Sequence, residues 1–348
     1  MTGLENWFHR IWYGGSRWYF LLIPLSWIFS VVALVRAGLY HAGVLRTYDV
    51  GVPVIVVGNI TVGGTGKTPL TIWLARVLQS KGYYPGIVSR GYGGKKDDHP
   101  VEVTPRSDPN QVGDEAILLA TRSGCPVVVH ADRIRAAQLA RKLGARVLIA
   151  DDGLQHYRLH RDFEIALVDG SRAFGNGHML PAGPLREPIS RLELVDEVLL
   201  QKTPGVFPNK FGNRSDDLVT SEFSLVPGSF RSLDDAKEVT LDEFAGKRVH
   251  AVAAISNPQR FFRLLESLHI DVDGHAFRDH AQFDQSDLEF EDGLPVVMTE
   301  KDAVKCRQFA REGLWYLPVE VDFGDSRNMI WVDELLRQLK LREQRPGR

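Results

Sequence analysis

The chain has 348 residues, of which 44% are hydrophobic and 25% are charged, and its net charge at neutral pH is −2. This length exceeds one typical domain and predicts two, with enough apolar residues for a large core. The near-neutral charge lacks the basic excess of a nucleic-acid-binding protein. The two cysteines, Cys125 and Cys306, lie far apart and without the spacing of a zinc site. This pattern argues against a disulfide framework and indicates a reducing compartment.

The first 50 residues contain a long apolar segment, residues 18–35 (WYFLLIPLSWIFSVVALV), with Arg17 before it and Arg36 after it. As a helix it would be about 27 Å long, close to the thickness of a bilayer core, and aromatic residues gather at its start. A cleaved signal peptide is disfavoured because no small-residue cleavage site follows the segment. A buried core helix stays open as an alternative. The favoured interpretation is a membrane anchor that spans the bilayer or lies in its interface.

A glycine-rich turn between a strand and a helix follows at residues 53–70 (PVIVVGNITVGGTGKTPL). Residues 54–57 are typical of a buried strand, and Lys67 and Thr68 open a helical pattern. Successive backbone N–H groups of such a turn, with the helix N-terminus behind them, bind phosphate. We expect Lys67 to reach the phosphates and the Thr68 hydroxyl to bind Mg²⁺. The candidate nucleotide-binding residues are Thr61, which stands where the general motif has its first glycine, Val62, Gly63, Gly64, Thr65, Gly66, Lys67 and Thr68.

Strands and helices then alternate along the chain. Strands are expected at 86–89, 126–129, 147–150, 163–168 and 197–200, and helices at 71–81, 113–122 and 132–143. This order predicts an α/β fold with a mainly parallel sheet that is covered by helices, with ligands at the carboxyl ends of its strands.

The pattern changes after residue 203, where proline, glycine and asparagine punctuate short strand-like pieces. A second unit follows, with expected strands at 249–255, 295–298 and 315–321 and helices at 258–268 and 301–311. We therefore predict an apolar membrane-associated helical segment (1–50), a phosphate-loop domain (51–203), a hairpin-like connector (204–246) and a smaller C-terminal α/β domain (247–348).

Candidate catalytic side chains follow the strands. Asp151 and Asp152 end an apolar strand, where a phosphate-loop protein commonly uses a carboxylate to order Mg²⁺. Gln155 and His156 come directly after them and are candidate substrate contacts, although a structural role for His156 is equally open. Asp114 precedes a helical segment, and on its own it is typical of a helix N-cap.

Together these segments resemble the tetraacyldisaccharide 4′-kinase family of lipid A biosynthesis. The resemblance is carried by GNITVGGTGKTPL (58–70), SRGYG (89–93), VGDE (112–115), HADR (130–133), DDGLQH (151–156), GHMLPAGPLREP (177–188) and MTEKDAVK (298–305). It covers nearly the whole chain, and the family shares the double glycine of the phosphate loop.

The resemblance implies a kinase on the cytoplasmic face of the bacterial inner membrane, which transfers the γ-phosphate of ATP to the 4′-hydroxyl of an acylated glucosamine disaccharide 1-phosphate. It implies two α/β/α domains with the active site between them, ATP and Mg²⁺ as cofactors, and a lipid substrate and membrane lipid as partners, with no nucleic acid and no obligatory protein partner. Asp114 matches the catalytic base, which is assisted by His280, with His275 as the alternative. The acidic pair Asp151 and Asp152 is implied to bind Mg²⁺ with Thr68 and Glu187, and Arg186 to contact a phosphate; a surface ion pair is equally open for Arg186 and Glu187.

Two other classes of protein share some of these features. Regulatory and metallochaperone NTPases carry a similar loop, but they usually have a second lysine before the glycines, where this chain has Val62. A membrane scaffold with a vestigial loop is disfavoured because Lys67, Thr68 and both aspartates are intact.

Overall fold

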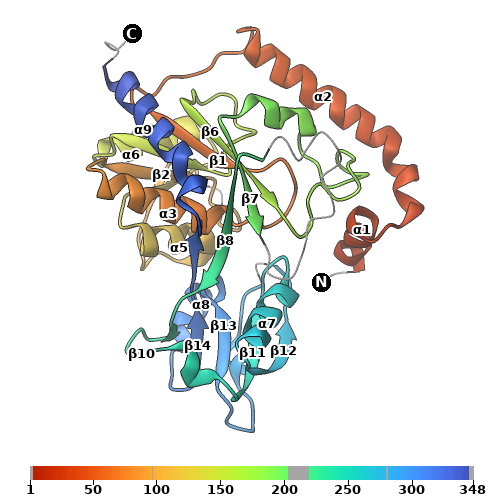
Figure 1. The fold of residues 1–348 in the computed structure, drawn as a ribbon, viewed down its shortest axis with the longest axis vertical. Coiled ribbons are helices and arrows are strands. Elements are labelled where there is room, and N and C mark those ends of the chain that lie inside the picture. The colour runs from red at the N-terminus through yellow and green to blue at the C-terminus, as the bar shows by residue number, and fades with distance from the viewer. Residues whose placement is uncertain (1–2, 96, 203–218, 280, 345–348) are drawn as a thin grey trace.

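The computed structural model describes residues 3–95, 97–202, 219–279 and 281–344. They form two α/β units, one on each of two sheets, and an apolar helical segment that lies along the outside of the first unit (Figure 1). This arrangement confirms the predicted α/β fold with mainly parallel sheets and an N-terminal apolar helix.

The first sheet has nine strands in the order β15-β8-β7-β6-β1-β5-β2-β4-β3. Its inner strands are parallel, and only the edge strands β3 and β15 pair antiparallel with their neighbours. The strands are β1 (Val54–Gly58), β2 (Pro85–Ser89), β3 (Val101–Val103), β4 (Val127–Val129), β5 (Val147–Asp151), β6 (Phe163–Asp169), β7 (Glu197–Lys202), β8 (Ser221–Pro227) and β15 (Val319–Asp322). Strands β1, β2, β4, β5 and β6 are buried throughout, and their sequences are accordingly mostly apolar.

Helices cover both faces of this sheet. Helices α3 (Lys67–Ser80), α5 (Asp114–Ser123) and α9 (Ile330–Glu343) share one core, and α6 (Arg133–Lys142) packs into the core on the other face. A short helix, α4 (Pro109–Val112), leads into α5. The phosphate loop thus lies at the carboxyl end of β1, next to the carboxyl end of β5, as expected for a ligand site in a parallel sheet.

The second sheet has six strands in the order β10-β9-β14-β13-β11-β12. They are β9 (Phe230–Ser232), β10 (Glu238–Val239), β11 (Arg248–Ala253), β12 (Asp271–Ala276), β13 (Val296–Thr299) and β14 (Leu314–Leu317), with helices α7 (Pro258–Ser267) and α8 (Glu300–Cys306). The edge strand β12 was not expected, because its sequence DVDGHA is polar and mostly not β-branched.

The predicted strand at 315–321 is two strands in the structure. Pro318 separates them, because proline lacks the N–H that a sheet ladder requires, and β14 joins the second sheet while β15 joins the first. The chain then stays with the first unit, where Trp331 of α9 lies 5.9 Å from Trp73 of α3, between ring centroids. The predicted C-terminal domain of residues 247–348 is therefore corrected: residues 319–343 complete the first unit.

The predicted connector is also divided between the sheets. Residues 204–218 lie outside the described residues; β8 belongs to the first sheet, and β9 and β10 form an antiparallel pair in the second. Where the chain crosses between units, the Gly228 N–H donates to the Pro318 carbonyl at 2.9 Å. The chain passes between the units twice, once from β8 to β9 and once from β14 to β15, and this hydrogen bond links the two passages.

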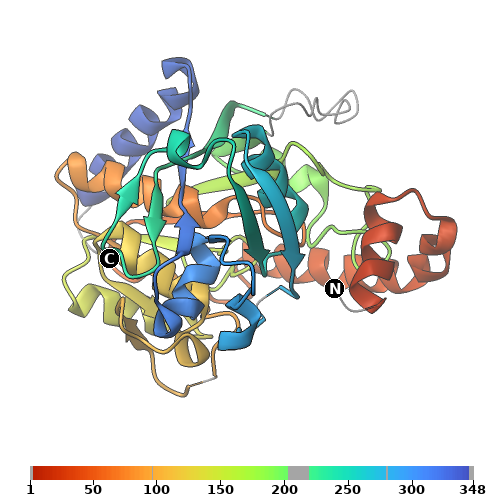
Figure 2. The same ribbon diagram turned by 90° about the horizontal axis from the view of Figure 1, so that it is seen from below.

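The N-terminal segment consists of α1 (Gly3–Tyr13), a 3₁₀ turn η1 (Arg17–Leu22) and α2 (Ile23–His41). Figure 2 shows these helices projecting at one side of the molecule. The helical stretch of residues 17–41 contains an 18-residue window with a mean hydropathy of 2.1, and only 6% of that window is buried. Of the described residues of α2, Ser26 alone is buried. The alternative of a buried core helix is therefore wrong, and the segment is long and apolar enough for membrane association.

Candidate active site

The phosphate loop connects β1 to α3. Gly66 caps the helix with φ 78° and Gly63 has φ 119°, left-handed values that favour glycine. A Cβ at Gly66 would also lie 3.2 Å from Gln201 Oε1. Thr65 Oγ1 is buried and finds no hydrogen-bond partner among the described residues. A buried polar atom without a partner, beside the N-terminus of a 14-residue helix, fits a phosphate oxygen.

Two cations, Lys67 of the loop and Arg186, converge on Asp152. Lys67 Nζ donates to Asn59 Oδ1 at 3.1 Å and lies 3.6 Å from Asp152 Oδ1. The Arg186 guanidinium donates to both carboxylate oxygens of Asp152, at 2.9 and 3.1 Å, and to the Asn59 carbonyl at 3.0 Å. Although burial opposes ionisation, Lys67 and Arg186 hold the pKa of Asp152 well below its usual range.

Asp151 is in the opposite electrostatic situation. Burial, together with the charges of Glu115 and Asp152, raises the pKa of Asp151 to about 7. Its Oδ1 accepts a hydrogen bond from the Thr71 hydroxyl at 3.2 Å. Thr68 lies one helical turn before Thr71 and so on the same face of α3. A hydroxyl and two carboxylates therefore face one region, and these are the oxygen donors that Mg²⁺ prefers.

The other predicted contacts surround the loop. The Gln155 amide donates to the Asn59 carbonyl at 3.1 Å. Burial and the nearby Arg133 charge lower the pKa of His156 to about 4, so this imidazole is neutral at pH 7, and its Nε2 has no hydrogen-bond partner among the described residues. Glu187 has partners outside the loop: its Oε1 accepts from the Tyr157 hydroxyl at 2.6 Å, and its Oε2 lies 3.7 Å from Arg191.

Asp114 is the first residue of α5 and is 4% exposed. The N-cap position belongs to Gly113, so the N-cap role considered for Asp114 falls to the preceding residue. Gly113 has φ 86°, and a Cβ there would lie 2.3 Å from the Tyr92 carbonyl oxygen. The SRGYG and VGDE segments therefore pack backbone against backbone, which requires glycine directly before Asp114.

Lys301 of α8 brings the second unit to Asp114. Its Nζ lies 3.9 Å from Asp114 Oδ2, 3.0 Å from Glu115 Oε1 and 3.5 Å from Asp279 Oδ1. Although burial opposes the charged form, these carboxylates raise the pKa of Lys301 above its usual range. Asp279 thus lies at the same lysine as Asp114.

Of the two candidate histidines, only His275 is among the described residues. His280 lies outside the described residues, directly after Asp279. His275 lies on β12, where its Nε2 is 3.0 Å from His250 Nδ1 and its ring packs on Phe290.

Several residues of the site were missed by the sequence reasoning. Arg133 donates to the Asp151 carbonyl at 2.9 Å and is 4% exposed, and Asn59 contacts both Lys67 and Arg186. Arg133 and Lys301 lie inside the HADR and MTEKDAVK segments, which were recognised without a role for these side chains. Ser256 carried no signal: it follows β11 in the second unit, and its Oγ would lie 3.0 Å from a Cβ at Gly64.

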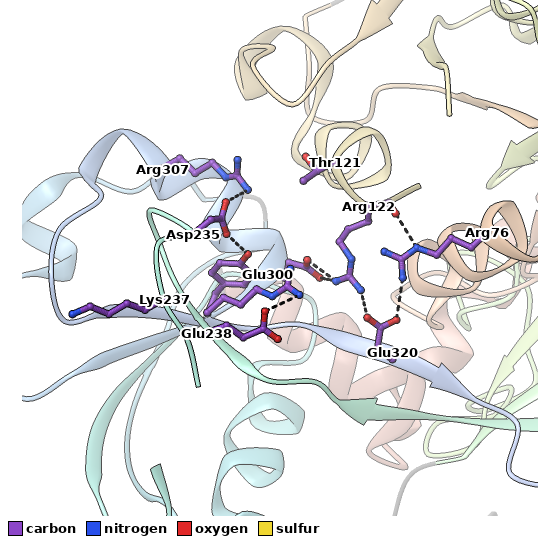
Figure 3. Close-up of a pocket in the computed structure, with 11 residues that line it drawn as sticks. Arg76, Thr121, Arg122, Asp235, Lys237, Glu238, Glu300, Arg307 and Glu320 are labelled. Atoms are coloured by element: carbon purple, nitrogen blue, oxygen red, sulfur yellow. Dashed lines mark hydrogen bonds and ion pairs between the residues drawn. The ribbon is translucent and has the colours of Figure 1, made fainter. Parts of the chain in front are cut away.

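A hollow of about 380 Å³ lies between the units at the other end of α5 (Figure 3). Arg122 donates to both carboxylate oxygens of Glu300, each at 2.6 Å, and also contacts Glu320. Arg76 pairs with the same Glu320 at 3.5 Å. The lining charges are thus largely matched by one another, and the hollow marks a junction between the units.

The model of a protein family described as tetraacyldisaccharide-1-P 4′-kinase matches residues 18–338. The chain belongs to this family. This membership confirms the resemblance and, with it, the predicted activity of a tetraacyldisaccharide 4′-kinase in lipid A biosynthesis. The family name implies a lipid disaccharide substrate.

Individual relatives agree with this assignment. The chain is 47% identical to a tetraacyldisaccharide 4′-kinase of Nitrosococcus oceani over 91% of its own length and 90% of the relative. It is also 47% identical to one of Methylobacillus flagellatus, over 91% of this chain and 92% of that one. Among solved structures, LpxK from Aquifex aeolicus, described as a complex with ATP, is 30% identical. It superposes with a TM-score of 0.74 over 93% of this chain and 98% of that one.

Proposed function

We propose that the site between the two units transfers the γ-phosphate of ATP to the 4′-hydroxyl of a tetraacyldisaccharide 1-phosphate that is held in the membrane surface. One observation carries the proposal: a short hydrogen-bonded path joins the apolar helix to the phosphate loop. Arg36 of α2 donates to the Gln155 carbonyl at 3.2 Å, Gln155 donates to the Asn59 carbonyl at 3.1 Å, and Asn59 accepts from Lys67 at 3.1 Å. A lipid substrate at the helix would have its sugar head beside the loop.

Residues 61–68 bind the nucleotide phosphates in this proposal. The Aquifex relative, which matches nearly the whole chain, is described in complex with ATP. The loop offers backbone N–H groups, the N-terminus of α3 and the Lys67 ammonium, and Arg186 adds a second cation beside Asp152. Gln155 lies on the path to α2, and Gln155 and the adjacent His156 are the proposed contacts of the substrate head.

Thr68, Asp151 and Asp152 are the proposed Mg²⁺ ligands, because their oxygen donors suit a hard cation and the two carboxylates with Glu115 concentrate negative charge there. When bound, Mg²⁺ would neutralise the charge that develops on the transferred phosphoryl group. Glu187 is left out of this set because its Oε1 accepts from the Tyr157 hydroxyl and its Oε2, although it makes no hydrogen bond among the described residues, lies 3.7 Å from Arg191.

Asp114 is the proposed general base. Its carboxylate would accept the proton of the 4′-hydroxyl as that oxygen attacks the γ-phosphorus. Lys301 acts as a positioning residue, since it ties Asp114 to the Asp279 segment of the second unit. His280, the residue after Asp279, is the proposed assistant of the base.

We further propose that α2 lies in the membrane interface on the cytoplasmic face of the inner membrane and does not span it. The helix touches the first unit along its length: Ser26 Oγ donates to the Met179 carbonyl at 2.7 Å, Arg36 to Gln155, and Tyr40 stacks on Tyr157 at 5.8 Å. From Ser26 to Tyr40 is about 21 Å along a helix axis. A helix attached to a folded unit over that length presents its opposite, apolar side to lipid.

The test is phosphoryl transfer to the lipid-linked disaccharide in detergent micelles, with wild type and Lys67→Ala compared. We expect Lys67→Ala to lose on the order of 10²-fold or more in turnover, since it removes one preorganised charge at the phosphates. The matched control is Lys81→Ala at the other, exposed end of α3, which should keep wild-type turnover. Near wild-type turnover in Lys67→Ala would reject the phosphate-loop assignment. ATP hydrolysis that is indifferent to the disaccharide would favour a regulatory NTPase.

A further inference from the structure

We propose that His250, Asp273 and His275 bind one divalent transition-metal ion of the zinc type in the second unit. These residues belong to neither the phosphate loop nor the Asp114–Lys301 group. His250 lies on β11, and Asp273 and His275 lie on β12, which pairs in parallel with β11. In that register His250 is opposite Asp273, and His275 follows two residues later on the same face of β12. The sheet itself thus brings two imidazoles and a carboxylate together.

The separations of the donor atoms suit a tetrahedral ion. His250 Nδ1 lies 3.0 Å from His275 Nε2, and Asp273 oxygens lie 3.7 Å from His250 Nδ1 and 3.8 Å from His275 Nε2. One ligand atom from each residue lies within 4.8 Å of the other two. Zinc bonds to imidazole and carboxylate are about 2.0–2.1 Å long, so tetrahedral ligands stand roughly 3.3–3.4 Å apart. Of the three distances between donor atoms, the one between the two histidines is shorter than this value and the two to Asp273 are longer.

A neighbouring carboxylate prepares His250 for this role. Both oxygens of Asp292 lie close to His250 Nε2, at 3.0 and 3.1 Å. A carboxylate accepts hydrogen bonds, so Nε2 carries the proton and Nδ1 of the neutral ring keeps its lone pair toward the cluster. The same carboxylate–imidazole pairing orients metal-bound histidines in many proteins.

The surroundings supply the rest of a metal site. Phe290 stacks on the His250 ring at 3.7 Å and packs at a tilt against the His275 ring at 4.6 Å, between centroids, and so supports both rings from an apolar side. The His250 side chain is 6% exposed, whereas those of His275 and Asp273 are 31% and 43% exposed. The ion would therefore have an entry path and room for water as a fourth ligand.

The ion would clamp the edge strand β12 to β11. Strand β12 ends at Ala276, three residues before Asp279, which meets Lys301 at the proposed active site. The residues of β12 are half-buried or exposed, so the strand is held mainly by its ladder and by α7. A metal cross-link between the strands would restrict the strand that leads toward Asp279. We expect it to stabilise the fold without taking part in phosphoryl transfer.

The experiment titrates the full-length protein in detergent with Co²⁺, whose visible absorption reports four-coordinate geometry, and with Zn²⁺ by calorimetry. Saturating Mg²⁺ is present throughout, because it occupies oxygen sites and competes weakly for imidazole. We expect one equivalent of metal per chain. His275→Gln and Asp273→Asn, both at partly exposed positions where the fold should persist, should abolish the Co²⁺ absorption bands. Asp292→Asn should weaken binding by about 10- to 100-fold, as expected for a residue that orients a ligand.

The matched control is His99→Gln, which removes a highly exposed imidazole that also lies beside an aspartate, Asp97. It should bind metal as the wild type does. Absence of stoichiometric Co²⁺ and Zn²⁺ binding, or equal binding by His275→Gln, would overturn the proposal. The cluster would then be a histidine–histidine hydrogen bond capped by Asp292. These outcomes are read from metal binding alone and do not depend on turnover, so they test the site separately from the kinase reaction.

Discussion

Asp151 and Asp152 are adjacent in the sequence, yet the folded protein shifts the pKa values of their carboxyl groups in opposite directions. Lys67 and Arg186 face Asp152 and keep it ionised, whereas burial with Glu115 and Asp152 nearby raises the pKa of Asp151 to about 7. Environment, and not residue type, separates the two groups. A site whose carboxylates repel one another in this way is suited to a divalent cation.

Asp114→Asn should keep ATP affinity and lose about 10²- to 10⁴-fold in turnover, because the amide has nearly the same shape but cannot accept the hydroxyl proton. Since Gly113 holds the N-cap position, the free energy of unfolding should change little. Kinase assays and nucleotide-binding titrations measure the first two quantities, and urea unfolding the third.

Glu115→Gln is the matched control for Asp114→Asn, because Glu115 shares Lys301 but is not the proposed base. Glu115→Gln should lose less turnover than Asp114→Asn. His280→Ala should also lose less, and the double variant with Asp114→Asn less than the product of the two, since residues that act as a unit are non-additive. Turnover of Asp114→Asn within a few-fold of wild type would rule out the base.

The neutral His156 makes stability depend on pH. Its folded-state pKa of about 4 lies below the usual value near 6.5, so between these values the unfolded chain binds a proton that the folded chain does not. The free energy of unfolding should therefore fall as the pH drops from 7 toward 4. In His156→Gln this decline should be shallower, and the stability difference between the two proteins should narrow at low pH. Parallel urea curves at pH 7 and pH 5 test this, and an equal decline in both would contradict it.

At the scale of the element, α2 stands out because its apolar side chains face outward. Trp27, Ile28, Val31 and Val32 are each 60–68% exposed, although a soluble helix would bury such residues. The helix is nevertheless held to the first unit by Ser26 and Arg36. Its outward apolar face is consistent with membrane association.

Replacing Ile28 and Val32 together by lysine should release the protein from vesicles of inner-membrane lipid and raise the apparent KM for the lipid substrate. Both positions are exposed, so thermal unfolding in detergent should be unchanged. Ile330→Lys is the matched control, since Ile330 is equally exposed but begins α9, which packs on the same face of the first sheet as α3. Vesicle sedimentation measures the binding, and continued sedimentation of the lysine variant would exclude this face as the anchor.

At the scale of the whole molecule, α8 joins the units through two neighbouring residues. Glu300 binds Arg122 near the end of α5, and Lys301 binds Asp114 and Glu115 at its beginning. The same helix pair therefore holds the junction of Figure 3 and the proposed base. A change at the junction should be felt at the active site.

Arg122→Ala should lower the free energy of unfolding by roughly 3–5 kcal/mol, because it leaves the buried Glu300 carboxylate without its partner. The side chains of this pair are 8% and 12% exposed. Arg337→Ala is the matched control: Arg337 pairs with Glu334 at the same 2.6 Å, but on the exposed face of α9, and its loss should have little effect. Urea unfolding measures both, and equal effects would show that the junction adds nothing through burial.

The sequence by itself determined the features that depend on neighbouring residues. The strand, glycines and helix at 53–70 specify the phosphate loop, because backbone conformation there follows from local sterics and the absence of a Cβ at Gly63 and Gly66. The apolar strands predicted a buried parallel sheet, because a strand that helices cover on both faces is apolar along its length. The acidic pair at the end of β5 followed from the rule that ligands gather at carboxyl ends of strands.

Only the tertiary structure decided what depends on contacts between distant segments. Lys301 meets Asp114 from 187 positions away, Pro318 sends β15 and α9 back to the first sheet, and the parallel register of β11 and β12 brings His250 to His275. The same apolar pattern of α2 would suit a core or a membrane, and its exposure separates the two. Spacing along a chain encodes the periodicity of one helix or strand, whereas these meetings depend on how whole elements pack against each other.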